Sequence, residues 1–97
     1  NYPYGWNSCR GSSASTGAQD YRGTAPASEP ETQAMMNLVA EIKPVFDISY
    51  HSYSEIVIYP YGCRPNRTPT EEAVEQIGGE IGKKINYRPG TAWELLY

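Results

Sequence analysis

The sequence predicts an α/β fold for a single small domain. Two stretches with amphipathic helical spacing, between Ser28 and Pro44 and from Thr68 to Ile85, alternate with two short stretches rich in branched and aromatic residues, 45–51 and 56–59. Such alternation of helices and strands is typical of α/β proteins. A chain of 97 residues has the length of one small domain, whose stability margin is thin because much of its apolar surface stays in contact with water.

Composition and charge argue against several classes of partner. Hydrophobic residues make up 39% and charged residues 20% of the chain, which is typical of a globular protein and not of a disordered tail. The net charge is −3 and the eight Lys and Arg residues are scattered, so no nucleic-acid partner is expected. The apolar stretches are far shorter than the roughly 20 residues of a membrane span, so no membrane partner is expected either.

The two cysteines leave two alternatives open. Cys9 and Cys63 can form one disulfide that closes a long loop, or they can be two buried free thiols. A metal site is less favoured because neither cysteine belongs to a C-x-x-C pair. A disulfide would indicate an extracellular or periplasmic location.

The first 26 residues show neither a helical nor a strand period, and they predict a long irregular loop. Loops of this length inside compact domains are usually functional or disordered. The aromatic residues of the stretch favour an ordered loop that packs on a neighbour: Tyr2, Tyr4, Trp6 and Tyr21.

The first helix is predicted to begin after Ser28 and to end before Pro44. Ser28 can cap it, Glu31 can complete a capping box, and Pro30 is tolerated in the first turn. One apolar stripe follows at helical spacing, comprising Ala34, Met35, Leu38, Val39 and Ile42.

Two strands are predicted after this helix. Residues 45–51 alternate so that Phe46, Ile48 and Tyr50 share one face, and the opposite face carries Val45, Asp47, Ser49 and His51. Residues 56–59 form the second strand, which Pro60 and Gly62 bring to an end.

The second helix is predicted to start at Thr68, with Pro69 in its first position and Glu71 completing another capping box. Its buried stripe comprises Val74, Ile77, Ile81 and Ile85. Its three glycines are Gly78, Gly79 and Gly82, and each costs about 1 kcal/mol relative to alanine, which close packing against a sheet would explain. Pro89-Gly90 predicts a turn, and residues 91–97 give no clear pattern.

His51 is the only histidine and the first candidate for chemistry. A single histidine is more often a packed or surface residue than a ligand. Its predicted place at the carboxyl end of a strand, before the polar residues 52–55, favours a site there, because open α/β sheets bind ligands at that edge.

The run from His51 to Gly62, H-S-Y-S-E-I-V-I-Y-P-Y-G, resembles the H-S-Y-S-Q…Y-P-Y-G stretch of the zinc metallocarboxypeptidase family, which includes pancreatic carboxypeptidases A and B. Residues 21–23 and 28–32 are similar to its Y-R-G and F-S-E-P-E-T stretches. Asn1-Tyr2 resembles the residues directly after the family's Asn-Arg pair, and residues 87–97 match the segment that ends in its mobile tyrosine. The resemblance spans the chain and implies part of a mixed central sheet flanked by helices.

The resemblance also implies roles for individual residues. His51 would be the third protein ligand of a catalytic Zn²⁺, and Tyr97 would fold over the C-terminal residue of the substrate. The Ser52 carbonyl would accept a hydrogen bond from substrate, and Tyr53 would line an outer subsite. The walls of the specificity pocket would be Ser49, Ile58, Gly62, Ala92 and Leu96. Without the resemblance, surface decoration suits Tyr53 as well, and a core position suits Ile58 and Leu96 better.

Several family features depart from the pattern or lie outside residues 1–97. Glu55 stands where many members have Gln, and Gly17 stands where mammalian members have a cysteine. The H-x-x-E zinc motif is absent, the Asn-Arg pair would precede Asn1, and the general-base glutamate would come after Tyr97. We therefore expect an internal segment of a catalytic domain of roughly 300 residues, which alone neither holds zinc tightly nor hydrolyses peptides.

The function that the resemblance implies is a secreted or periplasmic carboxypeptidase, which releases C-terminal residues of peptides with a zinc-activated water. One alternative is a non-catalytic peptide-binding or scaffold module derived from such an enzyme. A third keeps the zinc chemistry but acts on another substrate, such as bacterial cell-wall peptides.

Overall fold

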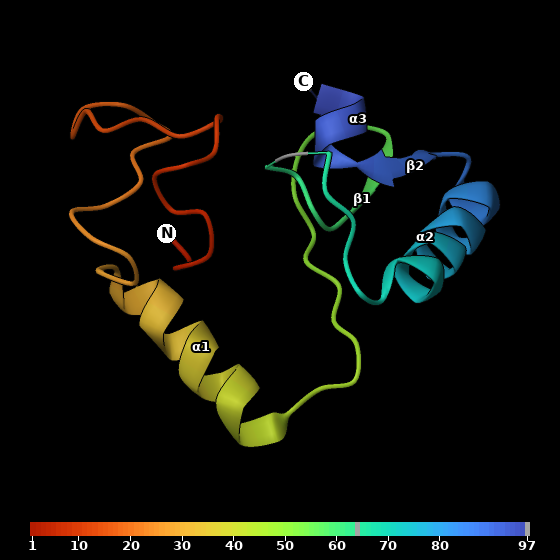
Figure 1. Cartoon of the computed structure of the whole chain (residues 1–97), viewed down its shortest axis with the longest axis horizontal. Coiled ribbons are helices and arrows are strands. Elements are labelled where there is room, and N and C mark those ends of the chain that lie inside the picture. The colour runs from red at the N-terminus through yellow and green to blue at the C-terminus, as the bar shows by residue number, and fades with distance from the viewer. Residues whose placement is uncertain (64, 97) are drawn as a thin grey trace. The chain divides into compact units, whose positions relative to one another are not determined.

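The structure, a computed structural model, describes residues 1–63 and 65–96 (Figure 1). Its elements in chain order are α1 (Pro30–Ile42), β1 (Ile56–Tyr59), α2 (Glu71–Ile85), β2 (Arg88–Thr91) and α3 (Ala92–Leu96). The chain divides into two compact units, Asn1–Ser49 and Tyr50–Tyr97. Helices that alternate with a pair of parallel strands confirm the α/β class.

Asn1 organises the irregular loop of the first unit. Its side-chain amide donates to the carbonyls of Arg22 and of Ala25, the latter at 3.0 Å, and its Oδ1 accepts the Glu29 N–H at 3.1 Å. Gly23 is buried there with φ +86°, and a Cβ on it would lie only 2.5 Å from Ser28 Oγ. The loop therefore needs a glycine at this point for two reasons, the positive φ and the lack of space.

The aromatic residues of this loop divide into two pairs. The Trp6 indole donates to the Arg22 carbonyl at 2.8 Å, and the Arg22 guanidinium lies 5.8 Å from the Trp6 ring centroid. Tyr21 is half-buried beside an isolated bridge to Ser13. Tyr2 and Tyr4 are exposed. The loop is thus ordered by hydrogen bonds, with only part of its aromatic surface covered.

Helix α1 confirms the first predicted helix, with Pro30 in its first turn. The predicted capping box is wrong, because Glu29 is the N-cap and makes no side-chain capping bond. The Ser28 hydroxyl instead donates to Glu29 Oε1 at 2.7 Å. The helix ends at Ile42, and the C-cap Lys43 is a left-handed residue whose N–H donates to the Val39 carbonyl at 2.9 Å.

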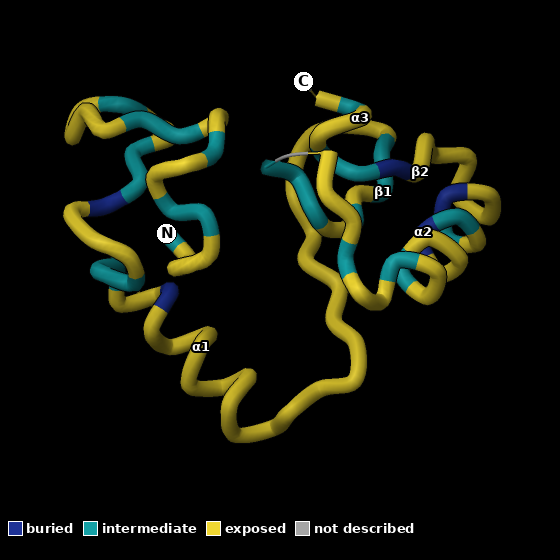
Figure 2. Tube along the Cα trace, viewed as in Figure 1, coloured by how far each residue is buried: buried dark blue, intermediate teal, exposed yellow. Residues whose placement is uncertain are grey.

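The apolar stripe of α1 is not covered by the described part of the chain. Figure 2 shows the helix and the segment after it as exposed, and every residue from 33 to 55 falls in that class. The large apolar side chains of α1 are 39–57% exposed, namely Met35, Met36, Leu38, Val39 and Ile42. None of the hydrophobic side chains that the structure describes is fully buried.

The strand predicted over residues 45–51 is wrong. These residues form no regular element, and Val45 and Tyr50 are almost fully exposed. Branched and aromatic residues favour extended backbone, but a strand also needs a neighbour for its N–H and C=O groups. The described residues place no pairing strand beside this segment.

The second unit contains a two-stranded parallel sheet. Strand β1 confirms the prediction for residues 56–59, and it pairs with β2 so that Ile58 aligns with Gly90. The turn predicted at Pro89-Gly90 is wrong, because both residues belong to β2. Arg88 donates its N–H to the Glu55 carbonyl at 3.0 Å. Because backbone nitrogens alternate in direction along a strand, the nitrogen of Pro89 points away from β1. The missing N–H of the proline therefore removes no hydrogen bond between the two strands.

Helix α2 confirms the second predicted helix, but it begins three residues later than expected. Thr70 is the N-cap, and the predicted capping box between Thr68 and Glu71 does not form. Thr68 Oγ1 accepts the Thr70 N–H at 2.9 Å, and the Glu71 carboxylate pairs with Arg67. The predicted stripe is only partly covered: Val74 and Ile81 are half-buried, whereas Ile77 and Ile85 are exposed.

Two of the three glycines of α2 lie against the sheet. A Cβ on Gly78 would lie 2.7 Å from the Tyr59 ring, and a Cβ on Gly82 would lie 2.8 Å from the Tyr87 carbonyl oxygen. Both glycines are buried, which confirms the prediction of close packing for them. Gly79 has no atom within 4 Å of its Cβ direction, so the same explanation is wrong there.

Cys9 and Cys63 are both disulfide-bonded, and neither is a free thiol. The alternative of two buried free thiols is therefore wrong. Among the described residues, no helix combines the length and the apolar character needed to cross a membrane.

Replacement of Gly82 and of Gly79 in α2 by alanine is predicted to change the free energy of unfolding in opposite directions. Gly82→Ala should lower the free energy of unfolding by about 1–3 kcal/mol, because the backbone oxygen of Tyr87 has to move. The matched control Gly79→Ala should raise it by up to about 1 kcal/mol, because a helical glycine is replaced where space is open. Chemical denaturation of the protein that contains this chain measures both, and a Gly82→Ala variant as stable as the unaltered protein would contradict the packing described.

Candidate functional site

The segment that carries His51 is exposed and irregular. His51, Ser52 and Tyr53 precede β1, and Tyr53 is 95% exposed. The prediction that His51 ends a strand is wrong, since no strand forms over residues 45–51. Cis peptide bonds join Ser52 to Tyr53 and Pro60 to Tyr61. The imidazole is therefore accessible, but no described sheet edge presents it.

The carboxyl ends of β1 and β2 bring two predicted site residues together. Because the strands are parallel, the segments after them leave the sheet at the same edge. Gly62 lies after β1 and Ala92 lies after β2, and a Cβ on Gly62 would lie 2.7 Å from the Ala92 Cβ. These two small residues thus form one tight contact, in which any side chain at position 62 would displace Ala92.

Ile58 and Leu96 are not core residues in this structure. Tyr59 contacts α2 through Gly78, so the alternation along β1 places Ile58 on the opposite face, where it is 47% exposed. Leu96 of α3 is 55% exposed, whereas Leu95 takes the packing role. A Cβ on buried Gly90 would lie 2.9 Å from Leu95 Cγ. The core alternative left open by the sequence is therefore wrong for both residues.

The structure does not test the places of two further predicted site residues, Ser49 and Tyr97. Ser49 is the last residue of the first unit and is exposed. Tyr97 lies outside the described residues.

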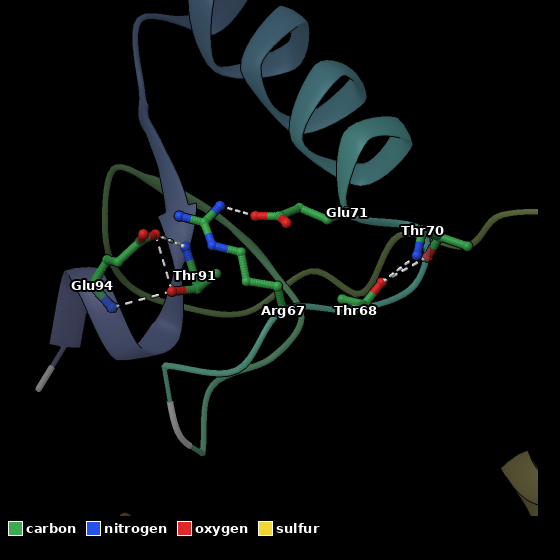
Figure 3. A network of polar contacts seen from close by, with 6 residues as sticks. All are labelled: Arg67, Thr68, Thr70, Glu71, Thr91 and Glu94. Carbon is green, nitrogen blue, oxygen red and sulfur yellow. Dashed lines mark hydrogen bonds and ion pairs between the residues drawn. The ribbon is translucent and has the colours of Figure 1, made fainter.

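A reciprocal pair of residues at the start of α3 was missed from the sequence. The Thr91 N–H and hydroxyl donate to Glu94 Oε2 at 2.9 and 3.0 Å, and the Glu94 N–H donates to Thr91 Oγ1 at 3.2 Å (Figure 3). This is a capping box, in which each side chain satisfies a backbone donor of the other residue. The T-x-x-E spacing of residues 91–94 was the signal that could have predicted it.

Arg67 is the cation among the charges near this capping box. It forms an ion pair with Glu71 at the start of α2, and its charge also favours ionisation of Glu94 (Figure 3). Hydrogen bonds from the Thr91 backbone and hydroxyl contribute more, and together they hold the pKa of Glu94 below its ordinary value. Partial burial raises the pKa of the Tyr59 hydroxyl above its ordinary value, and the negative charges of Glu75 and Glu94 raise it further. The positive charge of Arg67 lowers this pKa and offsets part of the increase.

An open hollow of about 400 Å³ lies beside the first half of α2. Its lining residues are polar or charged, namely Arg67, Glu71, Glu72, Glu75 and Gln76. None of them is a predicted site residue, and the hollow lacks the apolar walls typical of a small-molecule site.

The donor chemistry fits one metal ligand and not a complete set. Imidazole is a common zinc ligand, and His51 is the only one in the chain. Among residues 1–63 and 65–96, no three His, Cys, Asp or Glu side chains lie close enough together to hold a metal ion.

The chain is similar along its length to zinc carboxypeptidases. A family model described as "Zinc carboxypeptidase" matches residues 1–94. Carboxypeptidase O from Homo sapiens is 30% identical over 105 residues, which cover 100% of this chain and 28% of that protein. Mast cell carboxypeptidase A from Homo sapiens is 36% identical over 101 residues, which cover 100% of this chain and 22% of that protein.

A solved structure agrees with these sequence matches. Bovine thrombin-activatable fibrinolysis inhibitor, in complex with tick carboxypeptidase inhibitor, superposes with a TM-score of 0.74 at 32% identity, over 91% of this chain and 33% of that chain. The likeness confirms a carboxypeptidase-like fold. The chain spans about a quarter of the length of the curated relatives it matches.

The pKa of Glu94 is predicted to depend on the Thr91 hydroxyl. In the unaltered protein the carboxyl should titrate below 4.5, so its contribution to stability is present above pH 4.5 and is lost as the pH falls through the lowered folded-state value. Thr91→Val removes the hydroxyl donor but keeps the backbone donor, and it should raise the pKa part of the way to 4.5. Carboxyl ¹³C NMR measures the shift, and Thr70→Val is the control that should leave Glu94 unchanged. A Glu94 pKa at or above 4.5 in the unaltered protein would contradict the capping box.

Proposed function

Since this chain belongs to the zinc carboxypeptidase family, we propose that the protein containing it removes C-terminal residues from peptides by means of a metal-activated water. The observation that carries the proposal is the family match over residues 1–94. Residues 1–97 form an internal segment of a single catalytic domain, in keeping with the 22–33% of the relatives' length that the chain spans.

His51 is the zinc ligand that this segment supplies, and the remaining ligands come from other parts of the domain. His51 is exposed, and it begins the run 51–62 that resembles the family. Zinc, when bound, polarises the scissile carbonyl and lowers the pKa of its water.

The substrate lies along the segment from Ser52 to Tyr53 and reaches the carboxyl edge of β1 and β2. The Ser52 carbonyl accepts a hydrogen bond from the peptide, and the exposed Tyr53 ring lines an outer subsite. A backbone carbonyl fixes the register of a peptide without regard to its side chains, which suits an enzyme that acts on chain ends.

The pocket for the C-terminal side chain is built around Gly62 and Ala92. Their contact leaves no side chain larger than a methyl group at this point of the edge, and exposed apolar surface is available from Ile58 and Leu96. Ser49 adds a further wall. Tyr97, the proposed catalytic residue of the segment, closes over the bound terminal residue.

The rest of the catalytic domain is the partner that covers α1. An apolar helix face that is 39–57% exposed, with no fully buried hydrophobic side chain among the described residues, is unusual for an independent domain. The additional chain length of the relatives provides the surface that such a face needs.

The protein is secreted or periplasmic. Disulfide bonds persist in oxidising compartments and are rare in the cytosol, and both cysteines of the chain are disulfide-bonded.

The test of this function uses the protein with its flanking sequence. It should contain about one zinc per molecule and hydrolyse a blocked dipeptide. His51→Ala should weaken zinc affinity by more than about 100-fold and abolish hydrolysis, because one of three protein ligands is lost. Metal analysis and a hydrolysis assay measure these effects.

Glu55→Gln is the control variant. It removes a nearby carboxylate that is assigned no metal role, and it should keep both zinc and activity. A metal-free, inactive parent protein would favour a peptide-binding scaffold, and full zinc binding by His51→Ala would remove His51 from the ligand set.

A further inference from the structure

We propose that Glu94 and Thr91 are positioning residues of the substrate pocket, because their reciprocal hydrogen bonds fix the first turn of α3 and with it the places of Ala92 and Leu96. This inference rests on the proposed function. It concerns the start of α3, a helix of only five residues that carries both Ala92 and Leu96.

The capping box is the main local constraint on α3. The helix has five residues, and a single isolated turn is unstable because nucleation fixes several backbone dihedrals for one hydrogen bond. Three hydrogen bonds of 2.9–3.2 Å between Thr91 and Glu94 offset this cost where β2 ends. The point at which strand becomes helix is thereby fixed at Thr91.

The same bonds set two pocket residues at once. Ala92 comes directly after the cap and makes the tight contact with Gly62, and Leu96 lies four residues later on the same helix face. The further contact of Leu95 with Gly90 anchors α3 on the sheet but leaves its start undefined. If the cap is lost, the first turn can unwind, and Ala92 and Leu96 then shift together.

Arg67 connects this cap to the rest of the second unit. Its ion pair with Glu71 holds the guanidinium at the start of α2, from where its positive charge favours the ionised, hydrogen-bonding form of Glu94 (Figure 3). The Arg67 charge thus adds to the two Thr91 hydrogen bonds in favouring the ionised Glu94 carboxylate.

The experiment compares two blocked dipeptides that differ only in their C-terminal side chain, one large and aromatic and one small. Thr91→Val and Glu94→Ala, made in the full-length enzyme, should lower the ratio of kcat/KM for the large over the small substrate by about fivefold, chiefly through KM. Partial unfolding cannot imitate this result, because a smaller active fraction lowers kcat equally for both substrates and leaves the ratio unchanged.

Conservative variants serve as matched controls. Thr91→Ser keeps the hydroxyl and Glu94→Gln keeps an acceptor oxygen, so both should retain the ratio to within about twofold. Glu80→Ala removes an exposed carboxylate of α2 whose partner is Gln76, and it should leave the ratio of kcat/KM for the two substrates unchanged.

The outcomes separate this inference from the proposed function. An unaltered protein without zinc-dependent hydrolysis overturns the function itself. An active unaltered enzyme whose ratio survives Thr91→Val and Glu94→Ala overturns the positioning role alone, as does an equal loss of the ratio in Thr91→Ser and Glu94→Gln. Should Glu94→Ala fail to fold, the comparison of Thr91→Val with Thr91→Ser decides.

Discussion

The close approach of α2 to the parallel strands at Gly78 and Gly82 is the constraint on which the second unit depends. Because no side chain intervenes, the helix backbone lies against the Tyr59 ring on β1 and against the Tyr87 carbonyl just before β2. The helix therefore covers one face of the strand pair at a distance that leaves no room for a Cβ at Gly78 or Gly82. The strands keep their register beneath it, and the segments after them meet at a single edge. The contact of Gly62 with Ala92 is a consequence of this arrangement.

The local elements were predictable where the signal was local. Helical spacing and flanking prolines predicted α1 and α2, and a branched apolar run before Pro60 predicted β1. The elements that depend on a distant partner were not predictable. Residues 45–51 have strand composition but no pairing neighbour in the described chain. Pro89-Gly90 has turn composition but becomes strand, because it pairs with Val57-Ile58 of β1. Composition thus indicates which segments favour extended backbone, but a strand forms only where a second strand lies beside the segment.

The three S/T-x-x-E sequences that precede helices illustrate the same competition within one chain. They begin at Ser28, Thr68 and Thr91, and only the last forms a capping box. At the first, the hydroxyl is engaged by Glu29 and by Asn1, which lies 27 residues earlier in the sequence. At the second, Arg67 takes the Glu71 carboxylate. Because Arg67 is held there, its charge supports Glu94 without displacing the Thr91 donors. An S/T-x-x-E sequence therefore forms a capping box only where its hydroxyl and its carboxylate have no stronger partner nearby.

The candidate site separates into a part that local structure builds and a part that it does not. The proposed pocket wall consists of β1, β2 and the cap of α3, all within the second unit, where Gly62 and Ala92 lie in contact. A zinc cage differs in kind, because its ligands converge from several segments and its strength depends on all of them together. His51 could be proposed as a zinc ligand only through the family run that it begins, since the described residues around it, an exposed loop before β1, include no cluster of metal-binding side chains. The proposed pocket wall therefore depends on contacts within this segment, whereas the proposed zinc site needs ligands from other parts of the domain.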